Sequence, residues 1–270
     1  MKIGNRVFED ANHTYVWGIL NVTPDSFSDG GKWNQLDRAL FHVEAMMKQG
    51  MDVLDVGGES ARPGYTPLLP VEEEIARVVP VIEAIKSRLD VPISLDTYKS
   101  GVAEAGILAG ADLINDIWGL KYDENMGNVI AKFQVPCCLM HNRKTSDYRN
   151  FLQDVKADLE ETMKLATEAG IQKESIILDP GVGFGKTYEQ NLQIRHHMDS
   201  LHELGCPVLL GCSRKSVIGL TLDLPVDQRE EGTMATTVMG YMAGCRFFRV
   251  HNVEANYRAL KMTEAICNQE

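Results

Sequence analysis

The sequence predicts an α/β fold, a (β/α)₈ TIM barrel formed by one domain. Two observations lead to this prediction. Eight short apolar runs alternate with longer amphipathic stretches, and a polar or charged residue stands at the end of each run. Runs that are apolar almost throughout are typical of parallel strands covered on both faces. A doubly wound open sheet is the alternative that the pattern leaves open.

The length of the chain agrees with one barrel. It has 270 residues, and no linker, charge block or low-complexity stretch divides it. A barrel of this kind takes roughly 250 residues. We therefore expect residues 1–270 to form a single domain.

The predicted strands are short and rich in aliphatic residues. In chain order they are YVWGILNV (15–22), MDVLDV (51–56), PISLD (92–96), ADLIND (111–116), PCCLMH (136–141), SIILD (175–179), PVLLGC (207–212) and RFFRVH (246–251). Helical periodicity marks 36–50, 71–89, 100–110, 151–170, 191–205, 231–244 and 254–266. Several of these stretches end in a glycine that favours a left-handed cap, namely Gly50, Gly110, Gly170, Gly205 and Gly244.

The strand ends carry the residues that can do chemistry. They are Asn21, Asp55, Asp96, Asn115 with Asp116, His141, Asp179, Ser213 with Arg214 and Lys215, and Arg249 with His251. In a barrel the carboxyl ends of all strands surround one mouth, where barrel active sites form. In an open sheet only two or three of them would converge.

The composition argues against several classes of function. The formal net charge is −11, which disfavours binding to nucleic acid or to a membrane because both are negatively charged. No stretch resembles a signal peptide or a membrane span, and the six cysteines include no C-x-x-C pair. We expect a cytoplasmic protein whose cysteines are reduced core residues. An anionic substrate would need a local group of Arg, Lys and His.

Two sets of strand-end residues suggest what is bound. Asp96, Asn115 and Asp179 are short polar groups that suit the donor and acceptor edge of a flat heterocycle, although each alone could be a helix cap. The cations are Arg62, Arg214, Lys215, Arg249 and His251. Such a set can hold a phosphate or pyrophosphate, and the neutral oxygen of Asn21 suits Mg²⁺ that keeps most of its waters and phosphate ligands.

Two long loops flank the predicted mouth. They are TPDSFSDGGKWNQ (23–35) and GGESARPGYTPLLP (57–70), both rich in Gly, Pro and Ser. This composition suits lids that close over a substrate, or two ordinary surface loops.

The stretch DPGVGFGKT (179–187) resembles a phosphate-binding loop but departs from it. Pro180 stands where the first glycine of G-x-x-x-x-G-K-[ST] is required, and proline has a fixed φ and no backbone N–H. We interpret the stretch as a tight strand-to-helix loop that lays Asp179 and Phe184 against the ligand.

Seven motifs in this order resemble the bacterial dihydropteroate synthase family. They are GILNVTPDSFSDGG, DVGGESARPG, SLDTYK, DLINDI, DPGVGFGKT, GCSRKS and FRVHNV. The resemblance implies a (β/α)₈ barrel, a homodimer and Mg²⁺. It also implies that 4-aminobenzoate is joined to 6-hydroxymethyl-7,8-dihydropterin diphosphate, which gives 7,8-dihydropteroate and pyrophosphate by dissociative loss of the diphosphate.

The resemblance also implies residue roles. Asp96, Asn115, Asp179 and Lys215 match pterin-binding residues, Asn21 matches the Mg²⁺ ligand, and Arg62, Arg249 and His251 match diphosphate-binding residues. Phe27, Asp29, Pro63 and Ser216 match the lids and the aminobenzoate subsite, which Lys215 shares. We expect Asp96, Asp179, Asp29, Arg62 and Lys215 to be catalytic.

Two positions depart from the family pattern. Ala61 replaces a residue with a hydroxyl group, and Asn252 replaces an aspartate next to His251. These departures keep open a non-catalytic pterin-binding homologue. A second alternative is a pterin-dependent methyltransferase that binds methyltetrahydrofolate, because it shares the barrel and the Asp–Asn–Asp set of pterin-binding residues. The anion-binding cations argue against the methyltransferase, since a methyl carrier has no diphosphate.

Overall fold

A computed structural model describes residues 1–9, 13–22, 32–59 and 69–269, with the backbone alone for 32–35. Eight parallel strands form the central sheet: β3 (Tyr15–Asn21), β4 (Val53–Gly57), β5 (Ile93–Asp96), β6 (Leu113–Asp116), β7 (Cys137–Met140), β8 (Ile176–Asp179), β9 (Leu209–Leu210) and β10 (Phe247–Val250). Each lies within one of the eight apolar runs of the sequence or extends one residue beyond it.

The sheet closes into a barrel. Its strand order is β8-β7-β6-β5-β4-β3-β10-β9, and a parallel bridge between Leu178 and Val208 joins β8 to the segment that leads into β9. The two ends of the sheet therefore meet, and the barrel prediction is confirmed over the open sheet.

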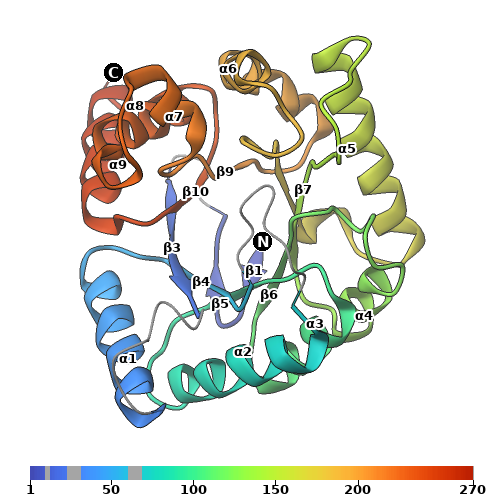
Figure 1. Ribbon diagram of the computed structural model, residues 1–270, viewed down its shortest axis with the longest axis vertical. Coiled ribbons are helices and arrows are strands. Elements are labelled where there is room, and N and C mark those ends of the chain that lie inside the picture. Colours follow the sequence, from blue (N-terminus) through green and yellow to red (C-terminus); the bar gives the residue numbers. More distant parts are fainter. Residues whose placement is uncertain (10–12, 23–31, 60–68, 270) are drawn as a thin grey trace.

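Helices surround the strands (Figure 1). They are α1 (Lys32–Lys48), α2 (Val71–Lys86), α3 (Ser100–Ala109), α4 (Met126–Phe133), α5 (Phe151–Glu168), α6 (Tyr188–His196), α7 (Ser216–Leu222), α8 (Glu230–Met242) and α9 (Val253–Cys267). In the described ranges, 3₁₀ helices also join these elements, namely η2 (Lys173–Ser175), η3 (Met198–Leu204) and η4 (Val226–Gln228).

The helical periodicity missed two short helices and merged two others. α4 and α7 have eight and seven residues, too few for a clear repeat. The stretch 191–205 is not one helix, because α6 ends at His196 and η3 follows. The start of α6 is set by a capping box in which Thr187 and Gln190 satisfy each other's backbone N–H groups.

The five glycines expected to end helical stretches do adopt left-handed backbone angles. The φ angles are +100° at Gly50, +116° at Gly110, +92° at Gly170, +73° at Gly205 and +91° at Gly244. A residue with a Cβ is strained in this region. These helix ends could thus be located from the sequence.

The strand alternation divides the core into two parts. Outward-facing strand residues pack against the helices, and inward-facing ones, such as Trp17, form a second cluster inside the barrel. The hairpin of β1 (Lys2–Ile3) and β2 (Arg6–Val7) adds Ile3, and Phe8 follows it into this second cluster. Figure 1 shows this N-terminal hairpin at the centre of the barrel. It was not expected from the sequence, because two-residue strands carry no periodicity.

All six cysteines are free thiols, and five are buried. Cys267, the last residue of α9, is exposed, so the expectation that every cysteine is a core residue is wrong at this position. No helix in the described part of the chain is long and apolar enough to cross a membrane.

Candidate active site

A row of polar side chains crosses neighbouring strands at their carboxyl ends. The strand register pairs Asn21 with Gly57, Gly57 with Asp96, and Asp96 with Asn115. A Cβ on Gly57 would lie 3.6 Å from the Cβ of Asp96 and 3.9 Å from Oδ1 of Asn21. The glycine therefore leaves room in the row between an amide and a carboxyl group.

Arg249 links two carboxylates in this mouth. Its Nε donates to Oδ2 of Asp55 at 2.5 Å, and its Nη2 donates to Oδ2 of Asp96 at 2.6 Å. Arg249 comes from β10, while the aspartates come from β4 and β5 on the far side of β3. One guanidinium thus links β10 to β4 and β5 across β3.

Asp55 is a site residue to which the sequence analysis assigned no role. Its side chain is fully buried, and its Oδ1 accepts hydrogen bonds from Oγ of Ser94 at 2.6 Å and from Nδ2 of Asn115 at 3.5 Å. The signal was present in the sequence. Asp55 lies within an apolar run, where a buried charge requires partners.

The ionisation of Asp96 depends on these neighbours. Burial raises the pKa of Asp96 to about 7, with Arg249 opposing the rise and Asp55 adding to it. Burial by itself would lower the pKa of Arg249, but the carboxylates of Asp55 and Asp96 raise it above its usual value. Arg249 is therefore a cation, while Asp96 exchanges its proton near neutral pH.

Asp179 and Lys215 complete the same mouth. A Cβ on Gly211 would lie 3.3 Å from Oδ2 of Asp179 and 4.0 Å from Nζ of Lys215. Burial raises the pKa of Asp179 and lowers that of Lys215, and the charge of each opposes the shift of the other. Asp96 and Arg249 also act electrostatically on Lys215. Within the described residues, the structure thus brings together the side chains of Asp96, Asn115, Asp179, Lys215 and Arg249.

An apolar wall lies beside the polar groups. Tyr98, Ile117 and Met140 form a buried cluster, and Trp118 and Phe184 pack against it. Of these residues only Phe184 was expected at the site. A flat ring can lie against such a wall while its edge meets carboxylates and amides.

The loop after β8 has the tight form expected from its sequence. Gly181 and Gly183 have φ angles of +67° and +89°. The N–H of Gly181 donates to Oδ1 of Asp179 at 2.7 Å, that of Gly183 to Oδ1 of Asn191 at 2.6 Å, and that of Phe184 to the Gly181 carbonyl at 3.0 Å. These amides are used within the protein, whereas a P-loop presents them to phosphate.

His251 and Asn252 follow β10. Nδ1 of His251 lies 3.0 Å from Oγ of Ser213, and its backbone N–H donates to the same oxygen at 3.2 Å. Oδ1 of Asn252 accepts the N–H of Ala255 at 3.2 Å and caps α9. Because Asn and Asp cap helices equally well, this departure from the family pattern leaves the helix start intact.

Two expected residues lie at the edge of the site. Arg214 has a positive φ of 57°, and its Nε lies 3.8 Å from Oε2 of Glu230 on α8. Its side chain therefore lies near a helix carboxylate, and its part in the anion-binding set stays a prediction. Ser216 is exposed at the first residue of α7.

Several expected site residues lie outside the described residues. They are Phe27, Asp29, Ala61, Arg62 and Pro63. Their roles stay predictions from the sequence.

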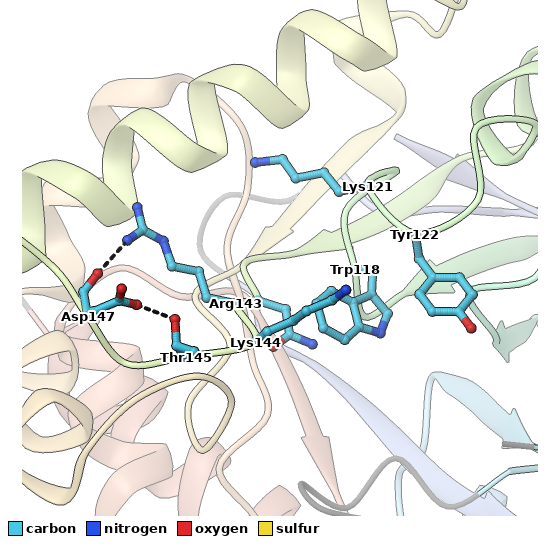
Figure 2. A pocket seen from close by; sticks show the side chains of 8 residues that line it. Trp118, Lys121, Tyr122, Arg143, Lys144, Thr145 and Asp147 are labelled. Atoms are coloured by element: carbon cyan, nitrogen blue, oxygen red, sulfur yellow. Dashed lines mark hydrogen bonds between the residues drawn. The ribbon is translucent and has the colours of Figure 1, made fainter. Parts of the chain in front are cut away.

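A separate pocket of about 520 Å³ opens next to the apolar wall. It lies between the segments after β6 and β7 (Figure 2), and Trp118, Tyr122 and Lys144 are among the residues that line it. None of the expected site residues that the structure describes is among them. The pocket therefore lies outside the group of polar site residues. Trp118 belongs both to its lining and to the apolar wall.

Comparison with known proteins shows which family the chain resembles. The family model described as "Pterin binding enzyme" matches residues 17–251. A dihydropteroate synthase of Clostridium beijerinckii is 58% identical over 267 residues, which cover 98% of this chain and 99% of that one. The dihydropteroate synthase of Bacillus subtilis is 51% identical over 256 residues, covering 95% and 90%.

Solved structures agree. A dihydropteroate synthase of Clostridium difficile, crystallised in the presence of pteroic acid, has a TM-score of 0.94 and 47% identity and covers 97% of this chain and 100% of its own. A dihydropteroate synthase of Xanthomonas albilineans in complex with 7,8-dihydropteroate has a TM-score of 0.88 and 38% identity, with 96% of each chain covered.

Proposed function

The chain belongs to the dihydropteroate synthase family of pterin-binding enzymes, and from this premise we propose how its residues divide the work of the reaction. It is a transferase of folate biosynthesis. It joins 6-hydroxymethyl-7,8-dihydropterin diphosphate to 4-aminobenzoate and releases pyrophosphate. The convergence of Asp96, Asp179, Lys215 and Arg249 on one mouth is the observation that supports the assignment best.

The pterin is assigned to the deep part of the mouth. Asp96, Asn115 and Asp179 face its donor and acceptor edge, and Phe184 covers its face together with the apolar wall. Lys215 adds a donor next to Asp179. Carboxylates pair well with the adjacent N–H groups of a pterin ring. The pteroic acid and dihydropteroate named for the two solved relatives are consistent with this assignment.

The diphosphate is assigned to the rim. Arg249 and His251 follow one another on β10 and its end, and Arg62 belongs to the second long loop. Arg249 already contacts Asp96, so its guanidinium can join the pterin-binding carboxylate to the leaving anion. Charge-assisted hydrogen bonds of this kind stabilise the departing diphosphate.

Mg²⁺ fits the donor chemistry of this rim. No group of three His, Cys, Asp or Glu side chains in the described ranges could hold a metal ion by itself. The exposed Asn21 presents one neutral oxygen beside Asp96, and Mg²⁺ prefers such a site when water and phosphate oxygens complete its shell. When bound there, the ion would neutralise charge on the leaving diphosphate.

The reaction then proceeds by dissociation. Asp96 and Asp179 stabilise positive charge that develops on the pterin as its bond to the diphosphate breaks. The neutral arylamine attacks the exposed methylene carbon. Phe27, Pro63, Lys215 and Ser216 are assigned to 4-aminobenzoate, and Asp29 to the loop that closes over it. No covalent enzyme intermediate is required.

The enzyme is proposed to act as a cytoplasmic homodimer. Exposed apolar side chains gather on α7, η4 and α8, namely Leu220, Leu222, Val226, Met239 and Met242. Such patches mark interfaces. Five buried free thiols suit a reducing compartment.

Light scattering coupled to gel filtration tests the dimer. The double variant Met239→Glu, Leu220→Glu should have the mass of one chain. A variant that stays dimeric would show that this surface is not the dimer interface.

Pyrophosphate release separates the synthase from its two alternatives. The synthase should release pyrophosphate from the pterin diphosphate only when 4-aminobenzoate is present. A methyltransferase should release no pyrophosphate, whether 4-aminobenzoate is present or absent. A non-catalytic homologue should bind the pterin diphosphate without turnover. Release that does not depend on the arylamine would contradict the assignment.

A further inference from the structure

A buried group of charged residues lies behind the loop that follows β8. His141, at the end of β7, has a fully buried side chain. Its Nε2 lies 2.9 Å from Oδ2 of Asp158 on α5, and its Nδ1 lies 2.8 Å from Nζ of Lys186. The imidazole thus connects a helix carboxylate to a lysine of the loop. None of the three residues has a part in the reaction described above.

The contacts of Lys186 match those of an ammonium ion. Besides Nδ1 of His141, its Nζ lies 3.0 Å from the carbonyl oxygens of Gly181 and Phe184. These are three acceptors for three N–H groups, and a neutral amine could serve only two. Nδ1 of His141 then accepts, and Nε2–H donates to Asp158. Burial lowers the pKa of His141 to about 4, which agrees with a neutral imidazole.

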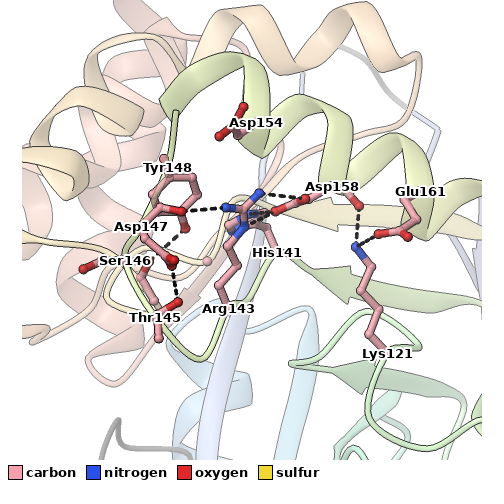
Figure 3. Close-up of polar contacts among 12 residues, drawn as sticks. Lys121, His141, Arg143, Thr145, Ser146, Asp147, Tyr148, Asp154, Asp158 and Glu161 are labelled. Atoms are coloured by element: carbon pink, nitrogen blue, oxygen red, sulfur yellow. Dashed lines mark hydrogen bonds and ion pairs between the residues drawn. The ribbon is translucent and has the colours of Figure 1, made fainter. Parts of the chain in front are cut away.

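Asp158 is itself fixed in place. Arg143 donates to it from Nε at 2.6 Å and from Nη2 at 3.0 Å (Figure 3). The guanidinium also lies 4.3 Å from the ring centre of Tyr148, whose hydroxyl donates to the carbonyl of Gly185 at 2.8 Å. A two-point contact of this kind fixes orientation as well as distance. Asp158 can therefore set the tautomer and tilt of the imidazole.

The two carbonyls held by Lys186 belong to the ligand-facing loop. The N–H of Gly181 donates to Oδ1 of Asp179 at 2.7 Å, so the position of Gly181 sets that carboxylate. The ring of Phe184 lies 4.6 Å from Nζ of Lys215. Any movement of Lys186 therefore reaches the side chains assigned to the pterin.

We propose that Asp158, His141 and Lys186 form a relay of positioning residues that holds the Gly181–Phe184 loop in the geometry that binds the pterin. The relay touches no substrate and acts through Asp179 and Phe184. This inference rests on the function assigned above, since it names the device that shapes one part of that site.

The charge of Lys186 makes the relay sensitive to pH. Burial lowers the pKa of Lys186 to about 7. The charged groups that face it are Asp179 of β8, Asp158 of α5, Lys215 ahead of α7, and Arg143 of the segment after β7. The ammonium is present below its pKa and is lost as the pH rises through about 7. One of its three hydrogen bonds is then lost.

The test compares Lys186→Met with the wild-type enzyme. The KM for the pterin diphosphate should rise about tenfold or more below pH 7, the loss expected for charge-assisted hydrogen bonds. The KM for 4-aminobenzoate should change less than about twofold, because the loop holds the pterin side. The ratio of variant to wild-type pterin KM should fall as the pH rises from 6 to 8.5, since only the wild type loses a proton at Lys186.

Two further variants keep the test decisive. His141→Leu removes an acceptor of Lys186 and should raise the pterin KM, while His141→Gln retains an acceptor and should restore much of the affinity. This pair decides the outcome if Lys186→Met does not fold. Lys144→Met is the matched control, because Lys144 is exposed on the neighbouring segment, and it should leave both KM values unchanged.

Two results would overturn the relay. They are an unchanged pterin KM in Lys186→Met at every pH, or equal values for His141→Leu and His141→Gln. Failure of the assigned function looks different, since wild-type pyrophosphate release would then not depend on 4-aminobenzoate.

Discussion

At the scale of single residues, the ionisation of the site's carboxyl groups depends on a cation that two of them share. Arg249 pairs with both Asp55 and Asp96. Burial raises the pKa of Asp96 to about 7, and the positive charge of Arg249, which is shared with Asp55, opposes this rise only in part. Ionised Asp96 is the form that can accept pterin N–H groups and stabilise positive charge.

Loss of Asp96 should affect pterin binding and turnover together. Asp96→Ala removes a charged acceptor worth about 1.5–3 kcal/mol, so kcat/KM for the pterin diphosphate should fall roughly 10–150-fold.

Arg62→Ala should mainly lower kcat, because the guanidinium of Arg62 is assigned to the leaving diphosphate. Steady-state kinetics with each substrate varied measures both. Wild-type rates in either variant would contradict these roles, and Asp227→Ala, on exposed η4, is the control.

The pH profile should be a narrow bell. Ionisation of Asp96, with its pKa of about 7, gives a rise of kcat/KM for the pterin diphosphate with pH. Loss of the Lys186 proton, also near 7, gives the fall. A profile from pH 5.5 to 9 measures both limbs. Asp96→Asn should abolish the acid limb and Lys186→Met the basic limb. A flat wild-type profile would exclude both assignments.

At the scale of elements, one buried lysine joins the ends of three of them. Nζ of Lys99, just before α3, donates to Oε2 of Glu59 at 2.6 Å, to Oε2 of Glu74 on α2 at 2.7 Å, and to the carbonyl of Leu69 at 2.6 Å. Glu59 follows β4, so the contact also fastens residues on either side of the second long loop. The strand and helix positions here depend on a compensated buried charge.

Lys99→Met should destabilise the fold strongly. It leaves two buried carboxylates without their cation, which costs about 3–5 kcal/mol. The free energy of unfolding in urea measures this loss. The control is Lys132→Met, whose pair with Glu104 is exposed on both sides, and it should cost less than about 1 kcal/mol. Equal losses in the two variants would contradict the structural role of Lys99.

At the scale of the whole molecule, the barrel separates stability from chemistry. The N-terminal hairpin and inward-facing aromatics fill one end, with Trp17 fully buried among them. The polar side chains occupy the carboxyl ends of the strands at the other end. This division is usual for barrels, and it lets an acidic protein keep a local group of cations at its mouth.

Trp17→Ala should lower stability without changing specificity. Truncation of a buried tryptophan costs about 3–5 kcal/mol, so the melting temperature should drop. At temperatures where the variant stays folded, both KM values should equal those of the wild type. A change in the pterin KM would show that the two ends of the barrel are coupled.

The sequence by itself determined the barrel, the eight strand positions, the glycine helix ends and the set of polar strand ends. Each follows from local pattern: apolar runs make buried strands, glycine adopts positive φ, and the carboxyl ends of parallel strands share one face. The functional family followed from motifs whose residues are close together in the chain.

Only the tertiary structure decided which side chains pair. It placed Asp55 under Arg249, turned Arg214 toward Glu230, added the N-terminal hairpin to the barrel interior and joined Asp158 to Lys186 through His141. These partners are far apart in sequence, and their contacts depend on the closure of the sheet and on burial. Periodicity reports which face a residue is on, whereas the partner of a buried charge is chosen by what the folded chain brings within hydrogen-bonding distance.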